Sequence, residues 1–248
     1  MKKPPAVTGA NLENYASDWS LEEYSREEGL RPVEAELVTE FFPAPPARVL
    51  DLGCGAGRTT GDLARRGYEV VAIDLAPRLL EMARVRYPSL DFREMDATAL
   101  EFEDASFDAV LFSYNGIDCI HPVASRRRAM AEAFRVLRPG GHFILSSHNV
   151  VGAIFSGGYF YLTGYWNAAR FLVDQLGNRL ATSGYLRYRD GGGVQYLYSA
   201  PPGRTVRQLE NTGFEVVTLR GYRRDSSPGF IRRRVQHVHF VARKPSSP

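Results

Sequence analysis

Short apolar segments alternate with amphipathic ones from residue 47 to residue 149, and this alternation restricts the chain to few folds. Segments such as "ARVLDLG", "YEVVAIDL" and "FDAVLFSYN" are typical of buried strands, whereas "RTTGDLARRG" and "SRRRAMAEAFRVLRPGG" have helical spacing and end at glycine. Strands that alternate with helices form a mainly parallel sheet with helices on both faces. The sequence therefore predicts a doubly wound α/β fold.

The pattern changes on both sides of this region. Residues 1–46 combine helix formers with aromatic residues and end in "PAPP", since proline cannot continue a helix. Residues 150–204 are crowded with aromatics and glycines, after which one helix and two strands resume the alternation. We predict a helical cap segment at 1–46, a core formed by 47–149 and 205–248, and an inserted lid at 150–204 with a helix near Tyr165–Leu176.

Composition narrows the class of protein. The chain has 248 residues, 44% of them hydrophobic, and a net charge of +3, which is ordinary for a globular protein. Its amino terminus has no signal-peptide pattern, and no apolar run approaches a membrane span. Two cysteines, Cys54 and Cys119, do not make a disulfide framework. We therefore expect a cytoplasmic protein without a membrane partner.

Three glycines alternate in "VLDLGCGAGRTT", directly after the first predicted strand. Ligands of open parallel sheets bind beyond the carboxyl ends of the strands, where glycine lets the backbone approach them closely. Asp74 ends the next strand, 21 residues after Gly53. This is close to the roughly 20-residue separation at which an acid reaches a ribose hydroxyl. The two features together predict an adenosine-containing ligand.

The dinucleotide fingerprint G-x-G-x-x-G is incomplete here. Its third glycine would fall at position 58, where the chain has Arg58, and the glycines instead occupy positions 53, 55 and 57. Pyrophosphate binding, and with it an NAD-dependent oxidoreductase, is therefore a less favoured alternative.

Five segments in order resemble the motifs of class I S-adenosylmethionine-dependent methyltransferases: "VLDLGCGAGRTT", "VVAIDLAPRLLEMAR", "MDATAL", "FDAVLFSYNGIDCIH" and "RVLRPGGHFILSSHN". The resemblance covers about residues 47–149. It implies a Rossmann-like, seven-stranded sheet that is mostly parallel with one antiparallel strand. It also implies S-adenosyl-L-methionine as cofactor, with S-adenosyl-L-homocysteine as product.

The resemblance also implies roles for particular residues. Asp51 would hold the ammonium of the cofactor, Asp74 its ribose hydroxyls and Asp96 its adenine amino group. Ser113 would face the region where the methyl group is presented. Further cofactor contacts are expected from Gly53, Cys54, Gly55, Gly57, Leu75 and Ala97, and from Tyr15 and Trp19 in the cap segment.

A catalytic base is needed only if the methyl acceptor must lose a proton. Asp118, His121 and His148 follow the fourth and fifth predicted strands and are the candidates, although each could instead shape a loop. His237 and His239 lie on the last strand, which we expect to lie away from the pocket, so we assign them to structure. The histidines and cysteines do not have zinc-ligand spacing, and we predict no metal.

The acceptor site is expected under the inserted segment. Aromatic side chains with polar tips suit a small-molecule pocket, although they could equally pack a small core of the insertion itself. The candidate acceptor-binding residues are Asn115, Tyr159, Tyr165, Trp166 and Tyr196. The arginine-rich segment from Arg220 to Arg234 would suit a phosphate or carboxylate of an anionic acceptor, or it is solvated surface.

These observations predict an enzyme that methylates an O, N or C atom of a small-molecule acceptor such as a natural product, sugar or peptide-like metabolite. The arginine-rich segment favours an RNA methyltransferase as the alternative. The modest net charge, and "FSYNG" in place of the Asn/Asp-Pro-Pro-Tyr motif, argue against a nucleic-acid partner. A non-catalytic module that binds the cofactor is a further alternative. The sequence does not predict an oligomeric state.

Overall fold

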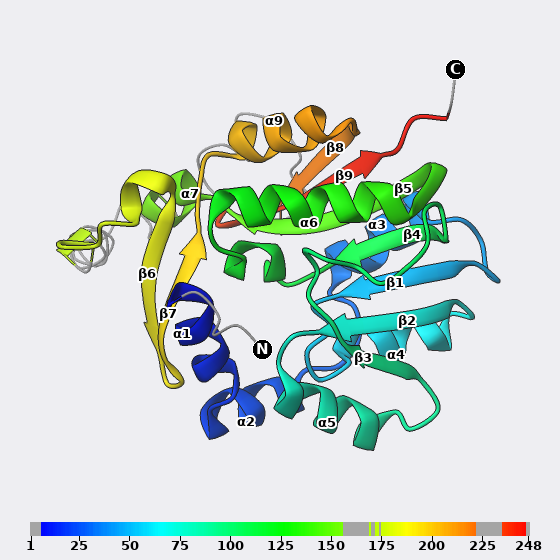
Figure 1. The fold of residues 1–248 in the computed structure, drawn as a ribbon, viewed down its shortest axis with the longest axis horizontal. Coiled ribbons are helices and arrows are strands. Elements are labelled where there is room, and N and C mark those ends of the chain that lie inside the picture. The colour runs from blue at the N-terminus through cyan, green and yellow to red at the C-terminus, as the bar shows by residue number, and fades with distance from the viewer. Residues whose placement is uncertain (1–5, 156–168, 170–171, 174, 222–234, 247–248) are drawn as a thin grey trace.

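Within the described residues, seven strands form one sheet in the order β3-β2-β1-β4-β5-β9-β8 (Figure 1). The computed structural model describes residues 6–155, 169, 172–173, 175–221 and 235–246. The strands of this sheet are β1 (Arg48–Leu52), β2 (Glu69–Asp74), β3 (Asp91–Glu94), β4 (Phe107–Phe112), β5 (Leu137–His148), β8 (Glu215–Gly221) and β9 (His237–Arg243). All neighbours are parallel except that β9 is antiparallel to β5 and β8. The predicted Rossmann-like sheet is confirmed.

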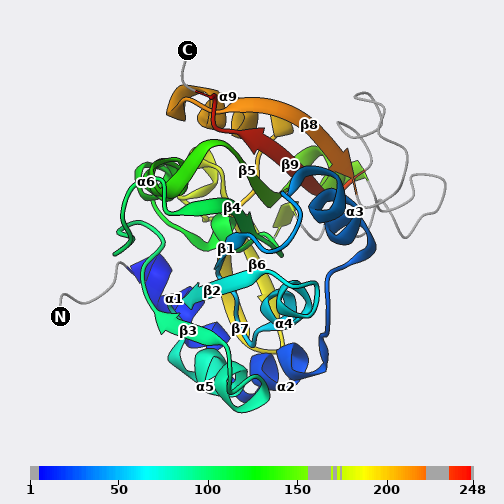
Figure 2. The same ribbon diagram turned by 90° about the vertical axis from the view of Figure 1, so that its right-hand side faces the viewer.

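Helices cover both faces of the sheet (Figure 2). Met130 of α6 and Leu209 of α9 pack on one face, against strand residues such as Leu50. Leu37 of α3 packs on the other face against Val49, with α4 and α5 beside it. The helices are α1 (Ala6–Tyr15), α2 (Asp18–Arg26), α3 (Pro32–Phe41), α4 (Arg58–Arg65), α5 (Pro77–Arg86), α6 (Val123–Val136), α7 (Val150–Phe155) and α9 (Pro202–Thr212), with short 3₁₀ turns η1 (Gly116–Cys119) and η2 (Ala181–Ser183).

The segment predicted as one cap contains helices in two different positions. Helix α3 lies on the sheet face, whereas α1 and α2 lie at the carboxyl edge of the strands (Figure 1). There, Tyr15 and Tyr24 pack against Ala56 and Ala76, which follow β1 and β2. The first two helices therefore cover the edge where a ligand would bind, and α3 belongs to the core.

Two aromatic rings pack closely on glycines of the turn after β1 and of the helix α4 that follows it. A Cβ on Gly53 would lie 2.8 Å from Cε2 of Phe112, and a Cβ on Gly61 would lie 2.4 Å from Cζ of Tyr87. Gly53 also has φ of +63°, a conformation that residues with side chains rarely adopt. Glycine at these positions thus reflects close packing as well as conformation.

The predicted insertion contains a second, two-stranded antiparallel sheet of β6 (Tyr185–Asp190) and β7 (Gly193–Tyr198), beside α1 at the left of Figure 1. The helix predicted near Tyr165–Leu176 lies largely outside the described residues. Among the described helices, none combines the length and apolarity that crossing a membrane requires.

Side-chain carboxamides close both outer edges of this small sheet. Arg187 of β6 lies opposite Tyr196 of β7. Gln175 donates to the Arg187 carbonyl at 3.0 Å and accepts from its N–H at 2.9 Å. The Asn11 side chain of α1 likewise donates to the Tyr196 carbonyl at 3.0 Å and accepts from the Tyr196 N–H at 2.9 Å. Each carboxamide therefore takes the place of a neighbouring strand, and Asn11 also fixes α1 to the insertion.

The antiparallel direction of β9 corrects one expectation. His237, at its amino end, lies opposite His148 at the carboxyl end of β5, and the two imidazole centroids are 5.0 Å apart. His237 therefore reaches the edge where ligands bind, although it was assigned to structure away from the pocket. Burial lowers the pKa of His237 from 6.5 to about 4, and the neighbouring His148 contributes to the shift. His237 is neutral at neutral pH.

We expect Gly61→Ala to lower the free energy of unfolding by about 1–3 kcal/mol, because the added methyl overlaps the Tyr87 ring. In a Tyr87→Ala background the same change should raise stability by up to about 1 kcal/mol, because alanine favours helix over glycine. Urea denaturation measures both values. Gly9→Ala is the control, since a Cβ there meets no atom within 4 Å. Equal effects of Gly61→Ala in both backgrounds would contradict the packing argument.

A second expectation concerns pH. The unfolded chain binds a proton at His237 below pH 6.5, whereas the folded chain does so only near pH 4. The free energy of unfolding that depends on neutral His237 therefore falls as the pH falls from 6.5 to about 4, by about 3 kcal/mol in total. Relative to His237→Gln, the wild-type protein should lose this amount between pH 7 and pH 4 in urea denaturation. A constant difference between the two proteins across that range would refute the assignment.

Candidate active site

Most of the predicted site residues that follow strands meet at the carboxyl edge of the sheet. The turn from Gly53 to Gly57 follows β1, and its three glycines have φ of +63°, +54° and +82°. The Gly55 N–H donates to Asp74 Oδ2 at 2.8 Å, so the end of β2 is tied to the turn. A Cβ on Gly55 would have Leu79 as its nearest neighbour, at 3.9 Å, so the backbone there is open to close approach.

Asp74 is held by backbone donors on both oxygens. Oδ1 accepts from the Ala76 N–H at 2.8 Å, and Oδ2 accepts from Gly55. Burial raises the pKa of Asp74, while these amide donors act in the opposite direction. Each carboxylate oxygen has a second lone pair, so Asp74 can still accept from ligand hydroxyls.

Asp51 and Cys54, which the resemblance implies at the cofactor, also make hydrogen bonds within the protein. Thr59 and Thr60 each donate a hydroxyl to Asp51 Oδ2 at 2.7 Å. Burial raises the pKa of Asp51 to about 6, although these hydroxyls oppose the shift. The Cys54 N–H donates to the Ile73 carbonyl, its carbonyl accepts from Gly57, and its side chain is buried. Cys54 is therefore a structural residue of the turn, and Asp51 fixes the start of α4.

The residues expected around an adenine lie after β2 and β3. Leu75 is exposed at the end of β2 and offers an apolar surface. Asp96 is exposed and accepts from the Thr98 N–H at 2.8 Å, which leaves lone pairs for a further donor. Ala97 is half-buried against the main core.

A buried ion pair lies beside the glycine turn. Arg58 Nη1 and Nη2 donate to the two carboxylate oxygens of Glu34 at 2.8 and 3.0 Å. Burial alone would raise the pKa of Glu34, but Arg58 and Ser113 lower it below its ordinary value. Ser113 donates to Glu34 and accepts from Arg58 Nη2 at 2.8 Å. The Ser113 hydroxyl is therefore engaged in this network, and its expected position facing the methyl group stays a prediction.

Two consecutive residues after β4 adopt left-handed backbone conformations. Tyr114 has φ of +52° and Asn115 has φ of +59°. Such strain in residues with side chains is typical of functional sites. Asn115 is buried, its N–H donates to Ser146 Oγ at 2.7 Å, and its Nδ2 lies 2.8 Å from His237 Nδ1. Its Oδ1 is buried without a partner.

Asp118 and His148, two of the three predicted base candidates, form a hydrogen-bonded pair. His148 Nδ1 lies 2.8 Å from Asp118 Oδ2, and the His148 N–H donates to the same oxygen at 2.7 Å. The Asp118 carboxylate is fully buried and also accepts from Ser147 Oγ at 2.7 Å and Arg126 Nη2 at 3.2 Å. Because a carboxylate oxygen can only accept, the contact requires Nδ1 of His148 to carry the proton, and Nε2 is left to accept one.

His121, the third candidate, has no such partner. Its Nδ1 is buried without a hydrogen bond, its ring packs on Tyr185 at 4.7 Å, and burial lowers its pKa. Its surroundings suit a packing residue of the loop before α6. The sequence could not distinguish it from His148, because the Asp118 contact depends on the tertiary structure.

Aromatic residues of the cap and the insertion surround this edge. The Tyr15 hydroxyl lies 3.1 Å from Cys119 Sγ, and Tyr24 contacts the rings of Tyr15 and Tyr114, each at 5.9 Å. Tyr188 of β6, which sequence reasoning missed, lies 5.8 Å from the His148 ring.

Trp19, expected at the cofactor, lies against the hairpin tip. A Cβ on Gly191 would lie 2.3 Å from its Nε1. Tyr196 contacts Asn11 through its backbone. Tyr159, Tyr165 and Trp166 lie outside the described residues.

Most of the arginine-rich segment also lies outside the described residues. Arg220 is described and pairs with Glu40 at 2.7 Å. Within the ranges that the structure covers, no three His, Cys, Asp or Glu side chains gather as ligands for a metal ion.

Three observations indicate that the carboxyl edge of the sheet can accommodate an adenosyl cofactor. The backbone at Gly55 is open, the Asp74 carboxylate retains acceptor capacity next to it, and Leu75 is exposed beside both. At position 58, where the dinucleotide fingerprint has glycine, the Arg58 side chain fills the space with its ion pair to Glu34.

Comparisons with known proteins agree with this geometry. Residues 50–145 match the methyltransferase domain family. A demethylmenaquinone methyltransferase of Renibacterium salmoninarum is 39% identical over 119 residues, which is 47% of this chain and 48% of that protein. A ubiquinone biosynthesis O-methyltransferase of Xanthomonas axonopodis pv. citri is 36% identical over 132 residues, 51% of this chain and 54% of that protein. The match thus covers about half the length of each of these curated relatives.

A solved structure extends the similarity of fold to nearly the whole chain. The 1,6-didemethyltoxoflavin-N1-methyltransferase of Burkholderia thailandensis, solved with 1,6-didemethyltoxoflavin and S-adenosylhomocysteine, superposes with a TM-score of 0.62. The superposition covers 99% of this chain and 94% of that one, at 21% identity. Residues 50–145 therefore match the methyltransferase domain family, and the seven-stranded sheet that contains them has the fold of this solved methyltransferase.

Proposed function

We propose that the protein transfers a methyl group from S-adenosylmethionine to a hydroxyl oxygen of a small aromatic or enolic acceptor. Oxygen is proposed as the methyl-accepting atom because His148 Nδ1 lies 2.8 Å from the buried Asp118 carboxylate. An acceptor hydroxyl must lose its proton on methylation, and a histidine oriented by a carboxylate is suited to take it. The ubiquinone biosynthesis relative, itself an O-methyltransferase, supports the same choice.

The cofactor would be held by residues already brought together at the edge. Asp74 would accept from the ribose hydroxyls, Asp96 from the adenine amino group, and Leu75 would pack against the adenine. The open backbone at Gly55 would lie against the methionine portion. Asp51, at the end of β1, would hold the ammonium group of the cofactor. When bound, S-adenosylmethionine supplies a methyl group activated by its sulfonium.

The chain's contribution to the reaction is orientation and proton removal. Asp118 holds the Nδ1 proton of His148, so that Nε2 accepts the hydroxyl proton of the acceptor. His237 is neutral and adds no competing positive charge beside His148. Asn115, with its unpartnered Oδ1 in the same cluster, would orient the acceptor. Tyr188 and the cap aromatics would shield the site from water, which strengthens each of these interactions.

Radiolabelled methyl transfer tests the function directly. The protein is incubated with methyl-labelled S-adenosylmethionine and a panel of phenols, enols, amines and thiols of similar size. We expect label in the phenols or enols. Transfer to amines or thiols alone would overturn the choice of oxygen, and binding of the cofactor without any transfer would favour a non-catalytic module.

We expect Asp74→Ala to weaken binding of S-adenosylhomocysteine by about 1–3 kcal/mol, because a hydrogen-bonding carboxylate at the ribose is lost. Isothermal titration calorimetry measures the affinity. Asp91→Ala is the matched control: its carboxylate is exposed at the amino end of β3, on the opposite edge, and binding should be unchanged. Unaltered affinity of a folded Asp74→Ala protein would count against the proposed ribose contact.

We expect His148→Gln to lower kcat by about 10²–10⁴-fold with unchanged affinity for S-adenosylhomocysteine, because proton removal is lost and the cofactor site is not. His121→Gln is the control and should retain most of the rate. The proposal fails if the two variants behave alike, or if His148→Gln keeps the wild-type rate.

A further inference from the structure

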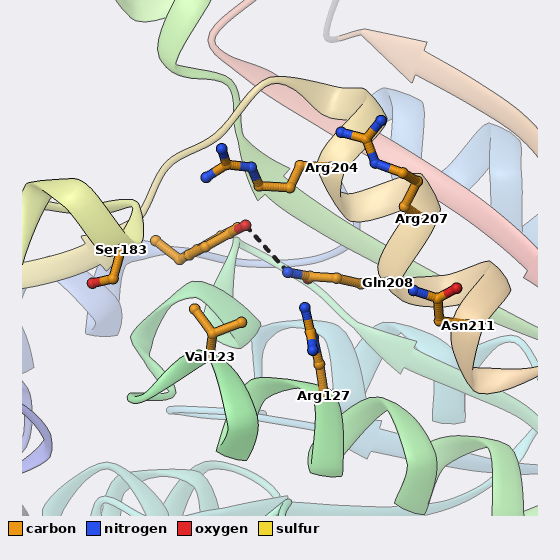
Figure 3. A pocket seen from close by; sticks show the side chains of 8 residues that line it. Val123, Arg127, Ser183, Arg204, Arg207, Gln208 and Asn211 are labelled. Atoms are coloured by element: carbon orange, nitrogen blue, oxygen red, sulfur yellow. Dashed lines mark hydrogen bonds between the residues drawn. The ribbon is translucent and has the colours of Figure 1, made fainter.

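A cavity of about 330 Å³ lies between the first two turns of α6 and one side of α9, apart from the site described above (Figure 3). Its wall combines three arginines with polar and apolar side chains. The lining residues are Val123, Arg127, Ser183, Tyr198, Arg204, Arg207, Gln208 and Asn211. No carboxylate is among them, so the cavity carries an unbalanced positive charge.

The arginines of this cavity lack acceptors. The guanidinium groups of Arg127 in α6 and of Arg204 and Arg207 in α9 have no hydrogen-bond or ion-pair partner among the residues that the structure describes. Arg204 and Arg207 are three residues apart on one helix, a spacing at which like charges repel. An anion between the helices would relieve this repulsion.

The helix ends add to the positive potential. Helices α6 and α9 both begin at the cavity, at Val123 and Pro202, and both run for more than ten residues. Neither has an acidic residue in its first turn or a side-chain cap on its amino end. The free N–H groups of a helix start carry partial positive charge and favour anions. Arg204 lies in the first turn of α9, where a cation is unfavourable unless an anion accompanies it.

The floor of the cavity is ordered. Gln208 is buried and its Nε2 donates to the Tyr198 hydroxyl at 3.2 Å, as the dashed line in Figure 3 shows. Gln208 Oε1 accepts from Arg126, whose guanidinium lies 4.4 Å from the centre of the Tyr198 ring. A fixed floor limits the rearrangement that binding requires.

We propose that this cavity binds a phosphate monoester of a small polyol or sugar. Guanidinium groups match the oxygens of phosphate, and a dianion suits three arginines and two helix starts. A volume of about 330 Å³ falls at the lower end of small-ligand sites, so it can hold an organic portion as well as the phosphate. Val123 offers apolar surface to that portion, and the side chains of Ser183 and Asn211 offer it polar groups. The inference does not depend on the proposed methyl transfer.

Calorimetric titration of the full chain with glucose 6-phosphate, inorganic phosphate and glucose tests the proposal at physiological salt. We expect glucose 6-phosphate to bind more tightly than inorganic phosphate, and glucose not to bind. Arg127→Gln and Arg204→Gln should each weaken binding about tenfold, the loss expected for one hydrogen bond to a charged group. Arg128→Gln removes the same charge from α6 outside the cavity and should have no effect.

Three results would overturn the proposal. The first is the absence of phosphate-dependent heat. The second is an equal loss in Arg128→Gln, which would indicate general attraction to a basic surface. The third is inorganic phosphate binding as tightly as the ester, which would leave no role for the organic portion. Circular dichroism and the affinity for S-adenosylhomocysteine confirm that each exposed arginine variant is folded.

Discussion

The buried carboxylate of Asp118 organises the carboxyl edge of the sheet more than any other single group. It accepts from the backbone and ring of His148, from Ser147 and from Arg126, so one side chain joins η1, the end of β5 and α6. A buried carboxylate is costly unless its oxygens are well paired, and four donors meet that requirement here. The same bonds leave His148 little freedom in tautomer or ring orientation. Structural stability and the proposed proton removal thus depend on the same set of contacts.

The sheet and its edge were predictable from sequence because they depend on local pattern. Apolar runs define the strands, glycine and proline end the helices, and parallel strands bring the residues after them to one edge. Asp74 and Asn115 reach that edge for this reason, and so does the Asp118–His148 pair, although their contact was not foreseen. One antiparallel strand was expected, but the sequence pattern did not identify it. Because that strand is β9, its amino end, with His237, lies where its neighbours have their carboxyl ends.

The remaining features arise from contacts between distant parts of the chain. Glu34 of α3 contacts Arg58 of α4 and Ser113 after β4, so the Ser113 hydroxyl, which the resemblance implies near the methyl group, is also held in an ion-pair network. Single-sequence patterns contain no record of such pairings, because burial and partners are set by the tertiary structure. The contacts of Cys54 illustrate a related limit: family motifs indicate where the backbone turns, but not which of its N–H and carbonyl groups are already used.

The carboxamides of Asn11 and Gln175 have a consequence for the solubility of the protein. A two-stranded sheet on the surface has two outer edges whose N–H and carbonyl groups can pair with any extended chain, including another copy of the same protein. At Arg187 and Tyr196 those groups are already taken by side chains. At this residue pair, the outer backbone groups of the small sheet are therefore paired without a third strand. Deleting α1 would reopen one edge and favour self-association, so the first helix protects the insertion as well as covering the site.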